Sequence, residues 1–111
     1  MAIRFEQALD ALSDSEAQLG AGMVAALSHP SRQQVAAFLA CLAPLGDDRR
    51  REVVARMVGS AEEQFRLDFD DLLRPLLADR DPLIRRLAIE GLWEDERPDL
   101  VDPLLRALTA D

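Results

Sequence analysis

The sequence predicts an all-α fold, an α-solenoid of stacked helical pairs that begins with a helical cap. Apolar residues recur at the spacing of one helix face through almost the whole chain. A ten-residue segment recurs 32 positions later, and a period of roughly 20 to 50 residues is typical of solenoids. The one segment that alternates with period two, 65–69, has no second strand with which to pair, and a lone strand is unstable. We therefore expect helices and connecting loops.

Residues 1–30 predict one short helix followed by an irregular stretch. The apolar residues of the helix share one face: Phe5, Ala8, Leu9 and Leu12. Gly20 and Gly22 weaken a helix, so we expect one or two helical turns and a loop over 13–30. Ser13 and Glu16 have the spacing of a capping box within this stretch.

Two longer helices are predicted between Pro30 and Ala61. Ser31 and Gln34 form a second capping-box pattern, which opens a helix that ends at Pro44 and Gly46. Its apolar stripe consists of Val35, Phe38, Leu39, Leu42 and Leu45. The next helix begins at Asp47 and Asp48, where the helix dipole favours negative charge. Its buried face consists of Val53, Val54, Met57, Val58 and Ala61.

Four arginines lie on this second helix, mostly outside its apolar face: Arg49, Arg50, Arg51 and Arg56. Such a cluster could bind the phosphates of a nucleic acid. The acidic balance of the chain favours instead a solvated face whose arginines pair with Asp47, Asp48 and Glu52.

The next segment is predicted to be an extended connector that places Phe65, Leu67 and Phe69 in the helical core. Asp70 or Asp71 should then cap a helix. The apolar residues of this helix are Leu72, Leu73, Leu76 and Leu77. Pro75 lies inside it and should kink or shorten it.

The internal repeat relates residues 70–79, DDLLRPLLAD, to residues 102–111, DPLLRALTAD, with seven of ten positions identical. Between the two copies we expect a turn with Asp81 as N-cap and a helix from Pro82 to Trp93, and then a further helix over 98–110. The apolar arc of the 82–93 helix consists of Leu83, Ile84, Leu87, Ala88, Gly91 and Leu92. The small residues Ala88 and Gly91 should let a neighbouring helix approach closely.

A pattern for the helical pair follows from these residues: Asp-x-Asp-Pro-x-Ile-Arg-x-x-Ala-x-x-x-Leu, formed by Asp79, Asp81, Pro82, Ile84, Arg85, Ala88 and Leu92. It resembles HEAT repeats, above all the short HEAT-like repeats first named for phycobilisome lyases. The resemblance covers 70–111 and implies one full unit and half of the next. It also implies a structural role for Arg85, which would bond Asp79 or Asp81. Residues 1–69 would be an atypical N-terminal helical cap.

The last residue, Asp111, is the repeat equivalent of Asp79, where the next helix of the pattern begins. We therefore expect the chain to be the N-terminal portion of a longer array. The last helix would leave one apolar side uncovered, formed by Leu104, Leu105 and Leu108. A homodimer through this C-terminal helix is the expected outcome if the chain exists alone.

Composition argues against several functions. Thirteen arginines, no lysine and 21 acidic residues give a net charge of −8, which disfavours nucleic acid and anionic membrane as partners. A single cysteine, Cys41, and a single histidine, His29, offer neither an internal disulfide nor a metal site, and no cofactor motif is present. We expect Cys41 to be a buried structural thiol and His29 to lie at the surface or at a helix start. The lack of a leader or membrane span predicts a cytoplasmic protein, and the Arg- and Ala-rich composition a bacterial one.

No arrangement of residues predicts catalysis, because the paired carboxylates fall in turns and at helix starts, where capping explains them. One polar stripe on the 82–93 helix has the composition of a protein-binding site: Arg86, Glu90, Trp93 and Glu94. A competing interpretation, which the pattern favours slightly, packs Trp93 under the next helix and makes Arg86 and Glu90 an ordinary i,i+4 pair.

These observations predict a non-catalytic protein–protein interaction scaffold. The alternatives are an accessory or regulatory subunit of a lyase-like enzyme and a small self-associating helical domain.

Overall fold

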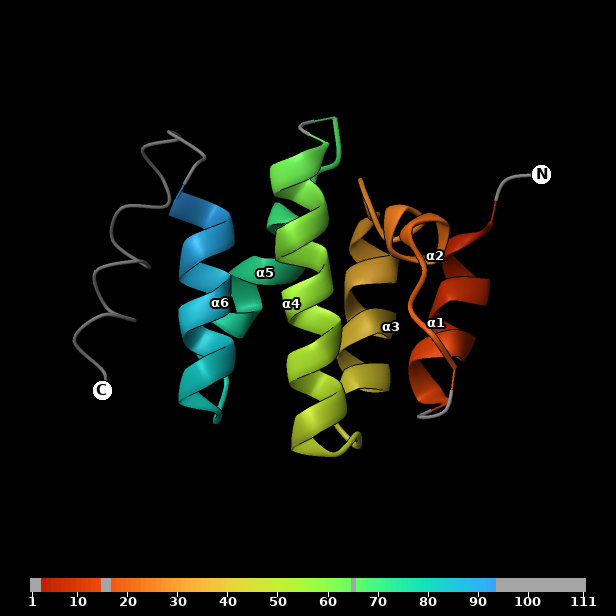
Figure 1. Ribbon diagram of the computed structural model, residues 1–111. Helices are drawn as coiled ribbons and strands as arrows, with labels where there is room; N and C mark the ends of the chain where they lie inside the picture. Colours follow the sequence, from red (N-terminus) through yellow and green to blue (C-terminus); the bar gives the residue numbers. More distant parts are fainter. Residues whose placement is uncertain (1–2, 15–16, 65, 94–111) are drawn as a thin grey trace.

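A computed structural model of the chain describes residues 3–14, 17–64 and 66–93 (Figure 1). These residues form helices and loops without a strand, so the all-α prediction is confirmed for this part of the chain. The helices are α1 (Phe5–Ser13), α2 (Ala21–Ala25), α3 (Arg32–Leu42), α4 (Asp47–Glu63), α5 (Asp70–Leu76) and α6 (Pro82–Trp93). The helix expected over 98–110 and the second copy of the repeat lie outside the described residues.

Each helix packs against the next but one along the chain. α1 packs on α3 and α3 on α5, while α2 packs on α4 and α4 on α6. Further contacts join α1 to α2 and α5 to α6. The odd-numbered helices therefore form one row and the even-numbered helices another. Figure 1 shows α4 and α6 side by side, with α5 behind them.

One apolar core runs through both rows, from Phe5 on α1 to Leu92 on α6. Phe38, Phe69 and Met57 are among its largest fully buried side chains. The division of the chain into a cap, 1–69, and repeats from residue 70 stays a prediction.

The two capping-box patterns have different outcomes. At the start of α3 the prediction is confirmed: Ser31 Oγ accepts from the Gln34 N–H at 3.2 Å, and the Gln34 side chain accepts from the Ser31 N–H at 2.9 Å. The prediction for Ser13 is wrong, because α1 continues through it and Ser13 is its last residue. The Ser13 hydroxyl turns back to the Leu9 carbonyl, 3.3 Å away, and the irregular stretch carries only the short helix α2.

The connector between α4 and α5 is partly as expected. Leu67 packs against the core and Phe69 is buried, whereas Phe65 lies outside the described residues. The connector is bonded to the loop that precedes α3. Asp68 donates its N–H to Ser28 Oγ at 2.7 Å, and the His29 N–H donates to the Asp68 carbonyl at 2.9 Å.

The start of α5 differs from the prediction. Asp70 and Asp71 are residues of its first turn, not its cap. Asp68 Oδ1 accepts from the Asp70 N–H at 3.0 Å, so the carboxylate that bonds the helix start comes from two residues earlier than expected. α5 has seven residues and contains Pro75, in line with the expected shortening.

α6 begins and packs largely as predicted. Asp81 Oδ1 accepts from the Leu83 N–H at 3.0 Å, which confirms Asp81 as the residue that caps this helix. A Cβ added to Gly91 would lie 2.6 Å from Leu73 Cδ1 and 3.2 Å from Val58 Cγ2, so the close approach at this glycine is confirmed.

Leu83 departs from the predicted apolar arc of α6. Ile84, Ala88 and Leu92 are fully buried, but Leu83 is 39 % exposed. Leu83 lies in the first turn, about 100° around the helix from Ile84. The side of α6 that contacts α4 and α5 is centred on Ile84, and Leu83 falls beyond its edge.

Candidate functional site

The arginines at the start of α4 are not the solvated row that the composition suggested. Arg49 and Arg50 are only 8 % and 2 % exposed. They precede the buried Val53 and Val54 by four residues, which places them on the same helix face. That spacing is the sequence signal that could have revealed their burial. The side chains of these two arginines are therefore engaged within the fold.

Arg49 binds the end of α1. Its Nη2 donates to the carbonyls of Ala11 and Asp14 at 2.8 and 2.7 Å, and its Nε donates to the Leu12 carbonyl at 3.3 Å. The last carbonyls of a helix lack partners within the helix and carry partial negative charge. Arg49 therefore caps α1 from the neighbouring row, while its Nη1 makes the expected pair with Glu52 at 2.7 Å.

Arg50 and Arg51 bind the turn that precedes α6. Arg50 Nη2 forms a buried ion pair with Asp79, and its Nη1 lies 3.5 Å from Asp47, the partner that the sequence suggested. Arg51 donates from Nε and Nη2 to the two oxygens of Asp81, at 2.6 and 3.2 Å. The hydrogen bond from Arg51 lowers the pKa of Asp81, and the hydrogen bond from the Leu83 N–H lowers it further.

The same turn is held from its other side by α6 itself. Arg85 Nη1 donates to the Asp79 carbonyl at 2.8 Å, which agrees with the structural role that the resemblance implied. Asp79 Oδ1 accepts from the Asp81 N–H at 2.9 Å, so the turn is also bonded internally. Together these bonds fix α6 against α4.

α4 and α6 have several buried positions in common when their sequences are aligned. Residues 35 positions apart are buried in both helices: Arg49 and Ile84, Val53 and Ala88, Met57 and Leu92. Ala55 and Glu90, related by the same offset, are exposed in both. The two helices therefore turn matching sides toward the core and matching sides outward.

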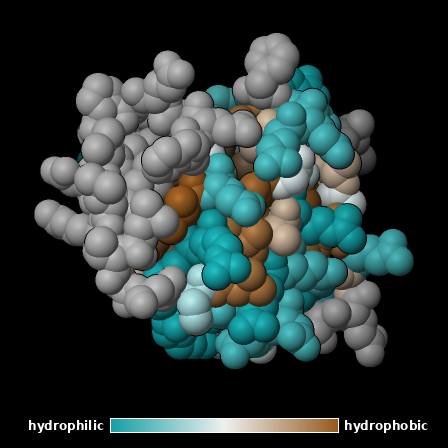
Figure 2. Space-filling model, turned by 60° about the vertical axis from the view of Figure 1, so that its left-hand side comes forward, coloured by the Kyte–Doolittle hydropathy of each residue, from teal (hydrophilic) through white to brown (hydrophobic). Residues whose placement is uncertain are grey.

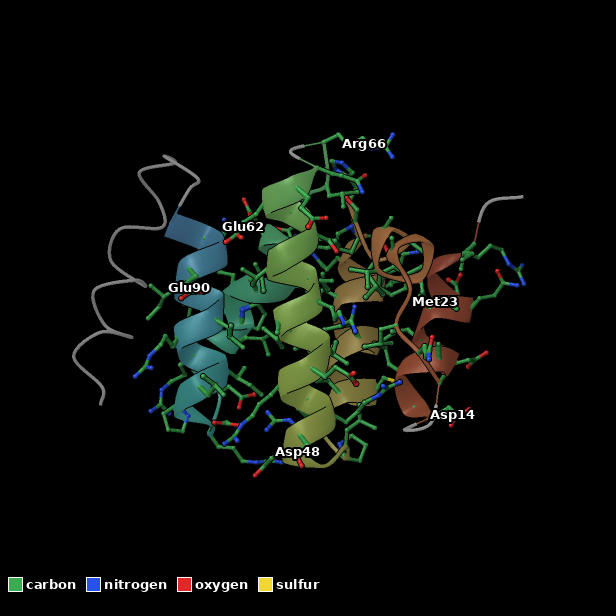
Figure 3. All side chains as sticks on the ribbon, viewed as in Figure 1. Asp14, Met23, Asp48, Glu62, Arg66 and Glu90 are labelled. Carbon is green, nitrogen blue, oxygen red and sulfur yellow. The ribbon has the colours of Figure 1, made fainter. Side chains whose placement is uncertain are left out.

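The outward side of these helices, here called the α4–α6 face, is mainly acidic. Figure 3 shows Asp48 and Glu62 at opposite ends of α4 and Glu90 on α6. Its exposed residues are Asp48, Glu52, Ala55, Arg56 and Glu62 on α4, and Arg86 and Glu90 on α6.

Two adjoining hollows lie along α4 next to this face. One of about 460 Å³ is lined by residues 17–20 and by Arg49, Glu52 and Arg56. The other, of about 240 Å³, is lined by α2 and by Arg56, Gly59 and Glu63 among others. Arg56 lines both, so the hollows form one groove between α4 and the chain around α2. Nothing in the sequence indicated this groove, because its two sides come from distant segments.

The predicted protein-binding residues are placed in part. Arg86 and Glu90 are exposed on α6, and within the described part of the chain no ion pair joins them. Trp93 is the last residue of α6, but its side chain and Glu94 lie outside what the structure describes. On the side of the molecule that carries α6, Figure 2 shows a strip of apolar residues bordered by hydrophilic side chains.

Cys41 and His29 have structural surroundings. Cys41 is half-buried, not fully buried as expected, and its Sγ donates to the Leu9 carbonyl at 3.4 Å and lies 2.9 Å from Ser13 Oγ. It therefore belongs to the contact between α1 and α3. His29 is exposed, as expected, in a left-handed conformation with φ 53°, and its Nε2 lies 3.1 Å from the Arg66 carbonyl.

Comparisons with protein-family models, curated proteins and solved structures give no match to this chain. Among the described residues, no group of three or more His, Cys, Asp or Glu side chains is arranged to hold a metal ion. Within the same ranges, no helix combines the length and the apolar character needed to cross a membrane.

Proposed function

We propose that this chain is a HEAT-like helical-repeat module that acts in the cytoplasm as a non-catalytic protein–protein interaction scaffold, as the N-terminal part of a longer array. The alternating contacts of odd and even helices support the repeat architecture, as does the common burial pattern of α4 and α6. In repeat proteins each helical pair contacts mainly its neighbours, and the stack offers an extended surface.

The observation that carries the proposal is the α4–α6 face. Both helices are fixed by buried side chains on one side and by the arginine contacts to the turn before α6 at one end. A surface that is already ordered loses little conformational freedom when a partner binds. The groove along α4 adds a concave element to it.

The charge of the face indicates the partner. Four exposed carboxylates lie on this face, from Asp48, Glu52, Glu62 and Glu90, against two exposed arginines, Arg56 and Arg86. A protein surface rich in lysine and arginine is complementary to this balance. Association should therefore weaken as ionic strength rises.

Site-specific photo-cross-linking in cells tests the proposal. A photoreactive amino acid replaces Glu52, Arg56, Arg86 or Glu90 in turn, and Gln33 or Ala37 on the exposed side of α3 serves as the control. The proposal predicts a discrete cross-link to one other protein from the α4–α6 positions and none from α3. Equal yields from both sets, or no cross-link from the first set, would contradict it. Cross-links only to a second copy of the chain would favour self-association instead.

A further inference from the structure

The smaller of the two hollows along α4, of about 240 Å³, contains one positive and one negative side chain. They are Arg56 and Glu63, both on α4. Arg56, Gly59 and Glu63 have the spacing i, i+3, i+7, which places them along one side of the helix. The lining between the two charges is small or apolar: Leu19, Ala21, Val24, Ala55, Gly59 and Ser60. The hollow therefore has a positive end, a neutral middle and a negative end.

Neither charged side chain has an ion-pair partner in the part of the chain that the structure describes. Both are exposed, and none of the ion pairs among these residues involves Arg56 or Glu63. Glu63 is the last residue of α4, whose last turn carries no basic residue. The C-terminal end of a helix carries partial negative charge, so a cation beside the Glu63 carboxylate would relieve an unfavourable interaction. A partner that supplies this cation and an anion for Arg56 would be stabilised at both ends.

The middle of the hollow is open because Gly59 has no side chain. A Cβ added to Gly59 would meet no atom within 4 Å. The main chain of a partner can therefore approach α4 closely at this point. A helix, about 10–12 Å across with its side chains, would occupy about four times the volume of the hollow over the same length of α4. The hollow therefore suits an extended segment better than a helix.

The distance between the two charges matches a particular extended conformation. Arg56 and Glu63 are seven residues apart, which is about 10 Å along α4 at about 1.5 Å per residue. A segment in the polyproline II conformation has three residues per turn and rises about 3.1 Å per residue. Side chains at positions i and i+3 of such a segment point the same way and start about 9 Å apart. A basic and an acidic residue at these positions can therefore reach Glu63 and Arg56 together.

We propose that this hollow binds an extended segment of the partner protein in which a basic and an acidic residue are three positions apart. The lysine or arginine of the segment pairs with Glu63, and its aspartate or glutamate pairs with Arg56. Two small residues between them lie over Gly59. This inference rests on the proposed scaffold function and names the part of the partner that enters the groove.

The probe for the test is the blocked tetrapeptide N-acetyl-Lys-Ala-Ala-Glu-amide, titrated into the full chain and followed by NMR. The main-chain amide signals of Ala55, Gly59 and Ser60 should shift saturably. The titration is done in about 0.15 M salt, which screens long-range attraction to the acidic chain. The doubly basic peptide N-acetyl-Lys-Ala-Ala-Lys-amide should bind roughly fivefold more weakly, because one of its lysines meets Arg56 instead of a carboxylate.

Two variants test the roles of the open middle and of the positive end. Gly59→Leu fills the hollow and should abolish binding, while Ala37→Leu, at an exposed position of α3, should leave it intact. Arg56→Glu makes both ends acidic, so it should invert the preference and bind the doubly basic peptide more tightly than the mixed one. A purely structural role of Arg56 would not produce this inversion.

Four results would overturn the inference: no saturable shift at these positions, equal binding of the two peptides by wild type, undiminished binding by the folded Gly59→Leu variant, or an unchanged preference in Arg56→Glu. Cross-linking from Arg86 and Glu90 on α6 does not depend on the hollow. If those cross-links form while the tetrapeptide fails to bind, the scaffold function stands and this inference alone is wrong.

Discussion

Arg51 and Asp81 form a two-point ion pair in which Nε and Nη2 each donate to a different carboxylate oxygen, at 2.6 and 3.2 Å. Arg51 lies in the first turns of α4, and Asp81 also accepts from the Leu83 N–H that begins α6. One carboxylate therefore caps α6 and ties it to α4. This contact and the buried ion pair of Arg50 with Asp79 fix the position of α6 relative to α4.

The ion pair between Arg51 and Asp81 predicts that the chain loses stability in acid. The hydrogen bond from Arg51 lowers the pKa of Asp81 in the folded chain, so the unfolded chain binds a proton more readily. The stability from this carboxylate is complete above its unfolded pKa, about 4, and is lost as pH falls through the lower folded value. Asp81→Asn retains a good capping side chain but no charge. Urea unfolding at a series of pH values should give a steeper acid loss for wild type than for the variant, and parallel curves would contradict this role.

Two glycines on neighbouring helices should respond to alanine in opposite ways. At Gly91 the new Cβ would meet the buried Leu73 at 2.6 Å, whereas at Gly59 it would meet nothing within 4 Å. Crowding costs about 1–3 kcal/mol, against a gain in helix propensity of about 1 kcal/mol. Gly91→Ala should lower the free energy of unfolding, and Gly59→Ala should raise it by about 0.5–1 kcal/mol. Chemical denaturation of both variants provides the measurement, and a stabilised Gly91→Ala would mean that α6 is not packed this closely.

Adjacent arginines on α6 should differ in their contribution to stability. Arg85 donates to the Asp79 carbonyl, while Arg86 is exposed. Arg85→Ala should destabilise the chain by about 1–3 kcal/mol, because its half-buried hydrogen bond to the turn before α6 is lost. Arg86→Ala should change stability by less than about 0.5 kcal/mol. Thermal unfolding of the two variants side by side checks this, and equal midpoints would remove the structural role of Arg85.

Arg49 should contribute more to stability than any exposed arginine of α4. Arg49→Met retains most of the apolar stem but removes the three hydrogen bonds that the guanidinium donates to carbonyls at the end of α1. We expect a loss of about 2–4 kcal/mol. The matched variant Arg56→Met removes an exposed arginine from the same helix and should cost less than about 0.5 kcal/mol. Equal losses in urea unfolding would show that Arg49 does not cap α1.

The sequence was informative where one element determined the outcome. The starts of α3 at Ser31 and of α6 at Pro82 follow from local capping chemistry. The close approach of a neighbouring helix at Gly91 follows from the missing side chain of this glycine. The burial of α4 follows from the spacing of Val53, Val54, Met57 and Val58. Each of these features depends on residues within a few helical turns of one another.

The sequence was less informative about contacts between segments that lie far apart along the chain. The partners of Arg50 and Arg51 lie about thirty residues further along the chain, at Asp79 and Asp81, so composition alone suggested a solvated row. The groove along α4 also joins segments far apart in the sequence. Of the predicted binding residues, Arg86 and Glu90 are exposed on α6, but their function depends on a partner that the sequence does not specify.

The scaffold proposal is tested most directly by the affinity of the cross-linked partner for three forms of the chain: wild type, Arg86→Glu and Arg32→Glu. Arg32, an exposed residue at the start of α3, lies outside the α4–α6 face and controls for the change in net charge. If α4 and α6 bind a lysine- and arginine-rich surface, Arg86→Glu should lower the dissociation constant by roughly tenfold, because it makes the face more negative, while Arg32→Glu should leave it near the wild-type value. Equal effects of the two variants, or no effect of Arg86→Glu, would contradict the claim that α4 and α6 form the binding face.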